Sequence, residues 1–111
     1  MASPTGKHAF VTYGVGDTYA PPPTIAAYAR AGQLTVVTPA ADDLKLTTAP
    51  PPLSDNETIA GTQRTVGLRE YTPVGDVDGH FVALIAGQPG RPDVERFLQR
   101  LLSGKTPAIG E

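Results

Sequence analysis

The chain has 111 residues, enough for one domain with a modest core but not for two. Nine basic and eleven acidic residues give a net charge of −2, and no basic stripe provides the electrostatic footprint of nucleic-acid binding. The given sequence contains no apolar run of membrane-spanning length and no signal-peptide pattern. It contains no cysteine, which excludes disulfides and thiolate zinc sites but leaves the compartment undecided.

The first half of the chain predicts a strand, a helix and a second strand. Residues 8–13 (HAFVTY) and 34–38 (LTVVT) are rich in β-branched and aromatic side chains, which is typical of buried strands. Between them, residues 24–32 (TIAAYARAG) place apolar side chains at helical spacing. Thr24 suits the N-cap of that helix and Gly32 its C-terminal end.

The second half predicts a long loop, a strand and a closing helix. Residues 39–62 form a proline-rich segment in which Pro50–Pro52 favour extended conformation, so we expect a long loop there. Residues 64–72 alternate in the manner of a strand. Residues 91–104 (RPDVERFLQRLLSG) predict a helix that begins with proline, ends at glycine and gathers one apolar face, formed by Val94, Phe97, Leu98 and Leu101.

Strands that alternate with helices predict an α/β fold with a small, mostly parallel three-stranded sheet and flanking helices. We expect a single domain over residues 8–104, a disordered start over residues 1–7 and a tail over residues 105–111. In such sheets functional side chains collect in the loops that follow the carboxyl ends of the strands. Two loops with this position hold Asp17 and His80.

Asp17 and His80 form the candidate site. Asp17 follows the first strand through two glycines (YGVGDTY), and His80 follows the last strand through TPVGDVDG. If these strands are neighbours, the carboxylate can come within hydrogen-bond reach of the imidazole. Such a carboxylate fixes the histidine tautomer and stabilises the imidazolium that forms during proton transfer. Histidine is the side chain whose ordinary pKa allows proton exchange near neutral pH.

The segments TYGVGDTYAPPPT and DGHFVAL, followed by VERFLQRLL, resemble the C-terminal portion of the α/β-hydrolase family, in particular its serine esterases and lipases. The resemblance extends from His8 to about Leu102. It implies that Asp17 corresponds to the triad acid and His80 to the catalytic base. The implied activity is hydrolysis of a small ester or lipid-like substrate without a cofactor.

The chain departs from this family at the nucleophile. It contains no Gly-x-Ser-x-Gly elbow, so it resembles the last part of a hydrolase without the front. Ser54 in the long loop is the candidate nucleophile within the chain; a serine from elsewhere or a water activated by His80 are the alternatives. We therefore expect weak or promiscuous esterase activity. Tyr13, Tyr19 and Phe81 are candidates to line an apolar acyl pocket.

Three further interpretations concern binding rather than catalysis. The chain is alternatively a non-catalytic relic module that binds apolar ligands or needs a partner chain. Asp76, Asp78 and His80 alternate as metal ligands on a strand would, but Gly75 and Gly79 favour a turn, and we expect no metal site. A three-stranded sheet leaves an unpaired edge, so we expect a homo-oligomer, a dimer formed through that edge or through an uncovered helix face.

Overall fold

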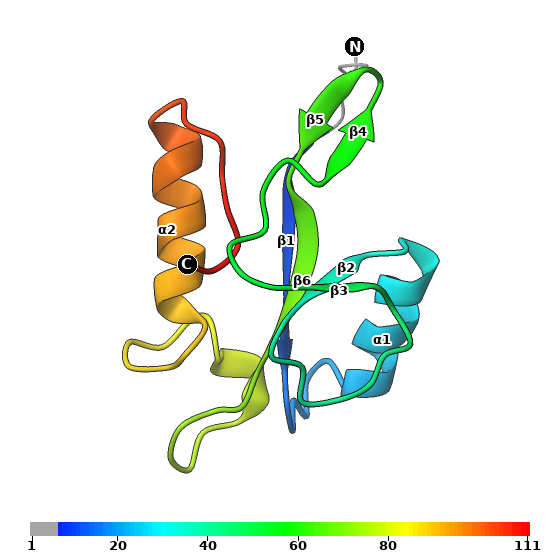
Figure 1. The fold of residues 1–111 in the computed structure, drawn as a ribbon. Coiled ribbons are helices and arrows are strands. Elements are labelled where there is room, and N and C mark those ends of the chain that lie inside the picture. Colours follow the sequence, from blue (N-terminus) through cyan, green and yellow to red (C-terminus); the bar gives the residue numbers. More distant parts are fainter. Residues whose placement is uncertain (1–6) are drawn as a thin grey trace.

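A computed structural model describes residues 7–111. We expected a disordered start over residues 1–7, and residues 1–6 of it lie outside the described residues. Residues 7–111 form six strands, two α-helices and one 3₁₀ helix (Figure 1). In chain order these are β1 (Ala9–Gly14), α1 (Pro22–Ala31), β2 (Thr35–Val37), β3 (Thr48–Ala49), β4 (Glu57–Ile59), β5 (Thr62–Arg64), β6 (Val66–Tyr71), the 3₁₀ helix η1 (Gly79–Phe81) and α2 (Arg91–Leu102).

The main sheet has four strands in the order β1-β6-β2-β3, and every neighbouring pair is parallel. The α/β class is therefore confirmed, whereas the expected number of three strands is wrong. The fourth strand is β3, whose two residues pair with Val36 and Val37 of β2. The segment 39–62 is accordingly not one continuous loop, because it also holds β4, which pairs with β5 in an antiparallel hairpin.

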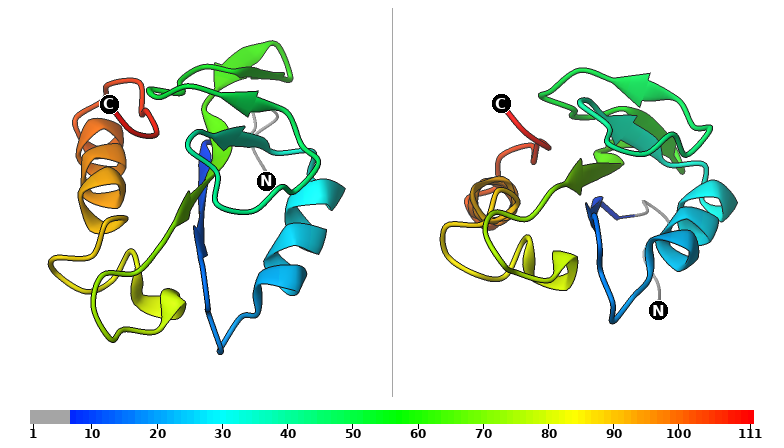
Figure 2. Two further views of the ribbon diagram at one scale, coloured as in Figure 1. Left: turned by 60° about the horizontal axis from the view of Figure 1, so that its bottom comes forward. Right: turned by 90° about the horizontal axis from the view of Figure 1, so that it is seen from below.

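The two α-helices cover opposite faces of the sheet, with the β4–β5 hairpin projecting beyond the sheet at the amino-terminal end of β6 (Figures 1 and 2). Each face has its own apolar cluster. The cluster under α1 consists of Tyr13, Ala26, Ala29, Leu34, Val36, Leu44 and Leu68. The cluster on the α2 side consists of Val37, Leu53, Phe97 and Ile109, with Phe10 and Ala49 packed against it.

The helix ends agree with the sequence at three of four termini. Helix α2 begins at Arg91 with proline in its first turn, and α1 ends before Gly32. The start of α1 differs: it begins at Pro22, two residues before Thr24, which is therefore not the N-cap. Proline suits the first helical position because its missing N–H would have had no helical partner there. Within residues 7–111, no helix has the length and apolar character needed to cross a bilayer.

The segment 105–111, which we expected as a tail after the domain, packs into the core. Ile109 is fully buried, and it exchanges two backbone hydrogen bonds with Leu53, of 3.0 and 2.9 Å. Pro107 is also buried, and its carbonyl accepts a hydrogen bond from the hydroxyl of Thr65. The last residues therefore complete the apolar cluster on the α2 side.

Candidate functional site

Parallel pairing brings the loops of the candidate site together. Strand β1 pairs with β6 from Ala9↔Val66 to Gly14↔Tyr71, so the two strands end side by side. The loops that follow them touch through their backbones at two glycines. A Cβ on Gly14 would lie 1.8 Å from the carbonyl oxygen of Gly79, and a Cβ on Gly79 would lie 2.2 Å from that of Val15. Only glycine allows this approach without a shift of the backbone.

Asp17 and His80 meet at this rim. Nδ1 of His80 lies 3.3 Å from Oδ2 of Asp17, so the proximity that the strand positions predicted is present. Asp17 is 7% exposed, and its other oxygen, Oδ1, accepts hydrogen bonds of 2.8 Å from the backbone N–H groups of Tyr19 and Ala20. The carboxylate is therefore held in one orientation, with one oxygen directed at the imidazole.

A second aspartate, Asp78, ties the two loops together. Its carboxylate accepts hydrogen bonds from the hydroxyl and the backbone N–H of Thr18 in the first loop. It also accepts one from the backbone N–H of His80, which makes it the N-cap of η1. These hydrogen bonds, that of the Thr18 hydroxyl above all, hold the pKa of Asp78 below its usual value. The sequence analysis did not assign this positioning role to Asp78, although aspartate is a preferred N-cap residue.

The alternation of Asp76, Asp78 and His80 does not lie on a strand, because residues 79–81 form a 3₁₀ helix. The carboxylate of Asp78 is instead engaged by Thr18 and by the backbone of His80. Among residues 7–111, no group of three histidine, aspartate or glutamate side chains has a metal-binding arrangement.

Aromatic side chains hold the His80 ring. The ring of Tyr19 lies 4.6 Å from it and that of Phe81 lies 5.2 Å from it, centroid to centroid, and the Phe81 ring is edge-on. The His80 side chain is 37% exposed, which leaves it open to solvent on one side. Tyr13 lies elsewhere: it is buried in the cluster under α1, and its hydroxyl donates a hydrogen bond to Asp42.

An apolar hollow, here called the β1 groove, lies beside the Asp17–His80 pair. Its volume is about 490 Å³, in the range typical of sites for small ligands. Side chains from β1, α1 and the segment after η1 form its walls. The lining residues are Val11, Thr12, Asp17, Ala20, Thr24, Ile25, Tyr28, His80, Ala83 and Leu84. Tyr13, Tyr19 and Phe81 are not among them; Tyr19 and Phe81 act on the histidine ring instead.

Ser54, the candidate nucleophile, is not brought to His80. It is exposed and lines a different hollow, together with Arg96 and Arg100 of α2, that shares no residue with the β1 groove. The other serine within the described residues, Ser103, donates to the carbonyl of Gln99 at the end of α2. The described part of the chain therefore places no serine hydroxyl against the imidazole.

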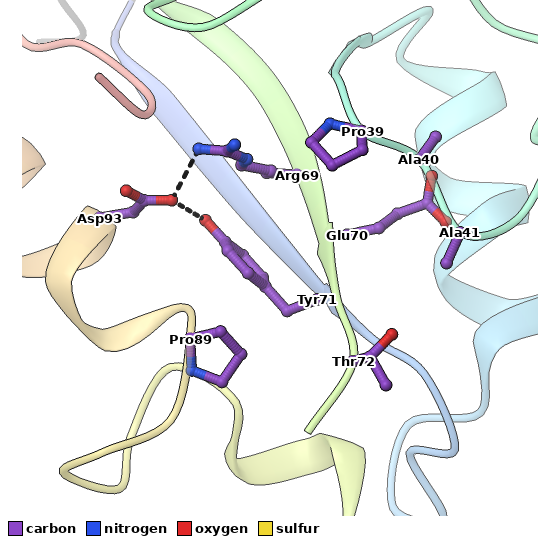
Figure 3. A pocket seen from close by; sticks show the side chains of 9 residues that line it. All are labelled: Pro39, Ala40, Ala41, Arg69, Glu70, Tyr71, Thr72, Pro89 and Asp93. Atoms are coloured by element: carbon purple, nitrogen blue, oxygen red, sulfur yellow. Dashed lines mark hydrogen bonds and ion pairs between the residues drawn. The ribbon is translucent and has the colours of Figure 1, made fainter. Parts of the chain in front are cut away.

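A further cavity of about 510 Å³ lies at the carboxyl ends of β2 and β6 (Figure 3). On one side of it, Asp93 of α2 accepts hydrogen bonds from Arg69 and from the hydroxyl of Tyr71, both on β6. Burial and this hydrogen bond raise the pKa of Tyr71. Arg96 also pairs with Asp93. Because these groups satisfy one another, they fasten α2 to the sheet rather than offering free ligands.

Comparisons with models of protein families, with curated proteins and with solved structures found no match to this chain. The fold class is established by the structure, and the chemistry rests on the geometry of the site. The features that bear on it are the Asp17–His80 pair and the groove beside it.

Proposed function

We propose that this protein is a weak carboxylic ester hydrolase that uses Asp17 and His80 as its acid–base pair. The observation that carries the proposal is the imidazole of His80, 3.3 Å from a buried and fixed carboxylate and in the wall of an apolar groove. An anchored carboxylate, an imidazole and an adjacent apolar hollow are the parts that general-base hydrolysis of a small ester requires.

The pairing assigns the two ring nitrogens of His80. A proton on Nδ1 is donated to Asp17 Oδ2, which leaves Nε2 as the acceptor. No described residue forms a hydrogen bond with Nε2. Nε2 takes a proton from a water molecule as the water oxygen attacks the acyl carbon. The tetrahedral intermediate then collapses, the bond to the leaving alcohol oxygen breaks, and Nε2 returns the proton to that oxygen.

The expected rate is low because the nucleophile is water. A positioned general base contributes about 10²–10⁴-fold, far less than a complete nucleophile, base and oxyanion-hole arrangement. The β1 groove selects for small apolar acyl or alcohol groups, since its walls carry Ile25, Tyr28 and Leu84. Weak turnover of several short esters, rather than one specific reaction, follows from these features.

The resemblance to α/β-hydrolases supports the same proposal. In that family the triad acid follows one late strand and the histidine follows the last strand, the order found here for Asp17 and His80. The closing helix α2 has a matching position after the histidine loop. The missing Gly-x-Ser-x-Gly elbow is the reason to propose a slow reaction with water, and we propose this family relationship on the motifs alone.

Hydrolysis of a short-chain nitrophenyl ester by the purified chain tests the proposal. We expect His80→Ala to remove the protein-dependent rate, and Asp17→Asn to lower it by about 10²-fold or more through loss of the correct tautomer. The control for background hydrolysis of the activated ester is His8→Gln, which removes the other imidazole of the chain, a half-buried one whose Nδ1 accepts a hydrogen bond from the backbone N–H of Thr65. Equal rates for the parent chain, His80→Ala and Asp17→Asn would refute the catalytic assignment.

A second candidate function is binding of apolar ligands without turnover. It is favoured by the absence of a serine at His80 within the described residues and by the largely apolar walls of the β1 groove. Titration with a short-chain fatty acid, followed by NMR shifts of Ile25 and Leu84, measures such binding. Saturable binding together with ester hydrolysis that is insensitive to His80→Ala would favour this function over the first.

A further inference from the structure

Strand β1 has one unpaired edge. It is the terminal strand of the sheet, with β6 on one side and no described strand on the other. The N–H group of Ala9 donates to the carbonyl of Thr65, just before β6, and that of Val15 donates to the carbonyl of Tyr71 at the end of β6. Every second residue of β1, starting at Ala9, therefore directs its backbone groups toward β6. The backbone N–H and C=O groups of Phe10 and Thr12 consequently face away from β6.

This edge lacks the features that normally protect a sheet edge. Proteins blunt exposed edges with charged side chains, proline, bulges or very short strands. Strand β1 is six residues long (AFVTYG), carries no charge and no proline, and pairs with β6 in unbroken register. The opposite edge differs, because β3 has only two residues and is followed directly by Pro50–Pro52. Of the two edges, β1 is the one suited to pairing.

The surface beside this edge is apolar. Tyr28 and Leu84 line the β1 groove and are 66% and 62% exposed. Apart from the Asp17–His80 pair, the groove is lined by uncharged residues. An unpaired backbone edge between exposed apolar side chains is a surface that a further strand can cover, with backbone hydrogen bonds and apolar burial acting together.

We propose that β1 pairs antiparallel with β1 of a second copy of this chain. A two-fold axis at Val11 sets Phe10 of each copy opposite Thr12 of the other. These are the residues whose backbone groups face outward, so each such pair exchanges two hydrogen bonds. The strand is thus complementary to itself, as an interface between two identical subunits requires. The two four-stranded sheets then join into one sheet of eight strands.

Pairing at this edge has a consequence that rests on the proposed function. Val11 and Thr12 form the β1 wall of the groove, so the incoming strand occupies the space where an ester would bind. The dimer is therefore the closed form and the monomer the open one. Ester hydrolysis per subunit should fall as protein concentration rises. A protein that hydrolyses no ester would overturn the proposed function but not the proposed dimer, because the mass of the dimer is measured independently.

Light scattering after size exclusion, on the full chain over a concentration series, measures the association. We expect the mass to rise from that of the 11.6 kDa chain toward twice this value. Thr12→Pro removes an outward N–H without removing a hydrogen bond to β6, so we expect a monomer. The control, Thr12→Val, keeps the N–H and should still dimerise. Circular dichroism reports whether each variant keeps its fold.

Amide hydrogen exchange of the parent chain gives a second measurement that needs no variant. In the dimer the amides of Phe10 and Thr12 should exchange with solvent at least about tenfold more slowly than at low protein concentration. The amides of Val11 and Tyr13, which face β6, should be protected at every concentration. A monomer throughout the series would overturn the proposal. So would a dimer with unprotected Phe10 and Thr12 amides, which would point to the exposed leucines of α2, Leu98, Leu101 and Leu102.

Discussion

Glu70 on β6 carries a buried carboxylate that is only partly satisfied. Its Oε1 accepts a hydrogen bond of 2.6 Å from the backbone N–H of Asp42, but within residues 7–111 its buried Oε2 has no hydrogen-bond partner. Glu70 is 5% exposed. Burial raises the pKa of this carboxyl, and the nearby charge of Asp42 acts in the same direction.

The direction of this shift fixes how Glu70 affects stability. Because the folded chain binds the proton of Glu70 more tightly than the unfolded chain, this side chain adds to the free energy of unfolding, and the addition is fully present below about pH 4. It is lost as the pH rises through the higher pKa of the folded state. Ionisation of Glu70 as the pH rises therefore places a carboxylate charge in surroundings that disfavour it.

Glu70→Gln should raise the free energy of unfolding at pH 7 by about 1 kcal/mol, since it removes a buried charge with an unpaired oxygen. The gain should vanish below about pH 4, where the parent side chain is itself neutral. Urea unfolding at the two pH values measures both effects. Glu57→Gln on the β4–β5 hairpin is the control, and a loss of stability in Glu70→Gln at pH 7 would contradict the argument.

At the residue scale the sequence locates the two ends of the candidate site but not what holds them. Asp17 and His80 were identifiable because each lies in a loop just after a predicted strand. The contact between Gly14 and Gly79, and the hydrogen bonds from Thr18 to Asp78, join residues about sixty positions apart. No local pattern encodes such contacts, since they depend on which strands become neighbours.

At the scale of elements, the close approach of the two loops gives a sharp test of the site. A methyl group on Gly79 would lie 2.2 Å from the carbonyl oxygen of Val15, and only a backbone shift relieves this clash. We expect Gly79→Ala to destabilise the protein by about 1–3 kcal/mol, the usual cost of overpacking. The same shift should separate His80 from Asp17 and lower ester hydrolysis.

Gly32→Ala provides the matched control for this variant. Its Cβ would meet its nearest neighbour, a methyl carbon of Leu34, at an ordinary 3.5 Å, and its backbone has a helical conformation. We expect its stability to stay within about 0.5 kcal/mol of the parent chain. Thermal unfolding of both variants measures the difference. Equal stability of the two would show that the loops adapt without cost.

The elements with clear periodicity were predictable, and the short strands β3, β4 and β5 were not. Strands β1 and β6 and helix α2 each show six or more residues of regular pattern. Strands β3, β4 and β5 have two or three residues each, too few to show alternation, and they lie in a proline-rich polar segment. Tertiary pairing with β2 is what makes β3 a strand.

At the scale of the whole molecule, the C-terminal segment closes the core. Ile109 was not predictable as a core residue, because it is the one large aliphatic side chain in a short segment that has no periodic apolar pattern. It is nevertheless fully buried between Leu53 and the α2 side of the sheet. The fold thus depends on seven residues that the sequence pattern places outside the domain.

Ile109→Ala should therefore cost about 2–5 kcal/mol, and Ile109→Val only about 0.5–1.5 kcal/mol, because the smaller deletion leaves a smaller cavity. Leu102→Ala, on an 86% exposed side chain of α2, should change stability by no more than about 0.5 kcal/mol. Denaturant unfolding ranks the three variants. An Ile109→Ala protein as stable as Leu102→Ala would show that residues 105–111 are dispensable.

The projecting hairpin of β4 and β5 is the natural place for a reporter group. Its turn consists of Ala60 and Gly61, both with positive φ, and it extends from the amino-terminal end of β6, whereas Asp17 and His80 follow the carboxyl ends of β1 and β6. A cysteine introduced at this turn would carry the only thiol in the sequence, so a fluorophore can be attached there selectively. Energy transfer between two such probes would follow subunit exchange without touching the rim that holds Asp17 and His80.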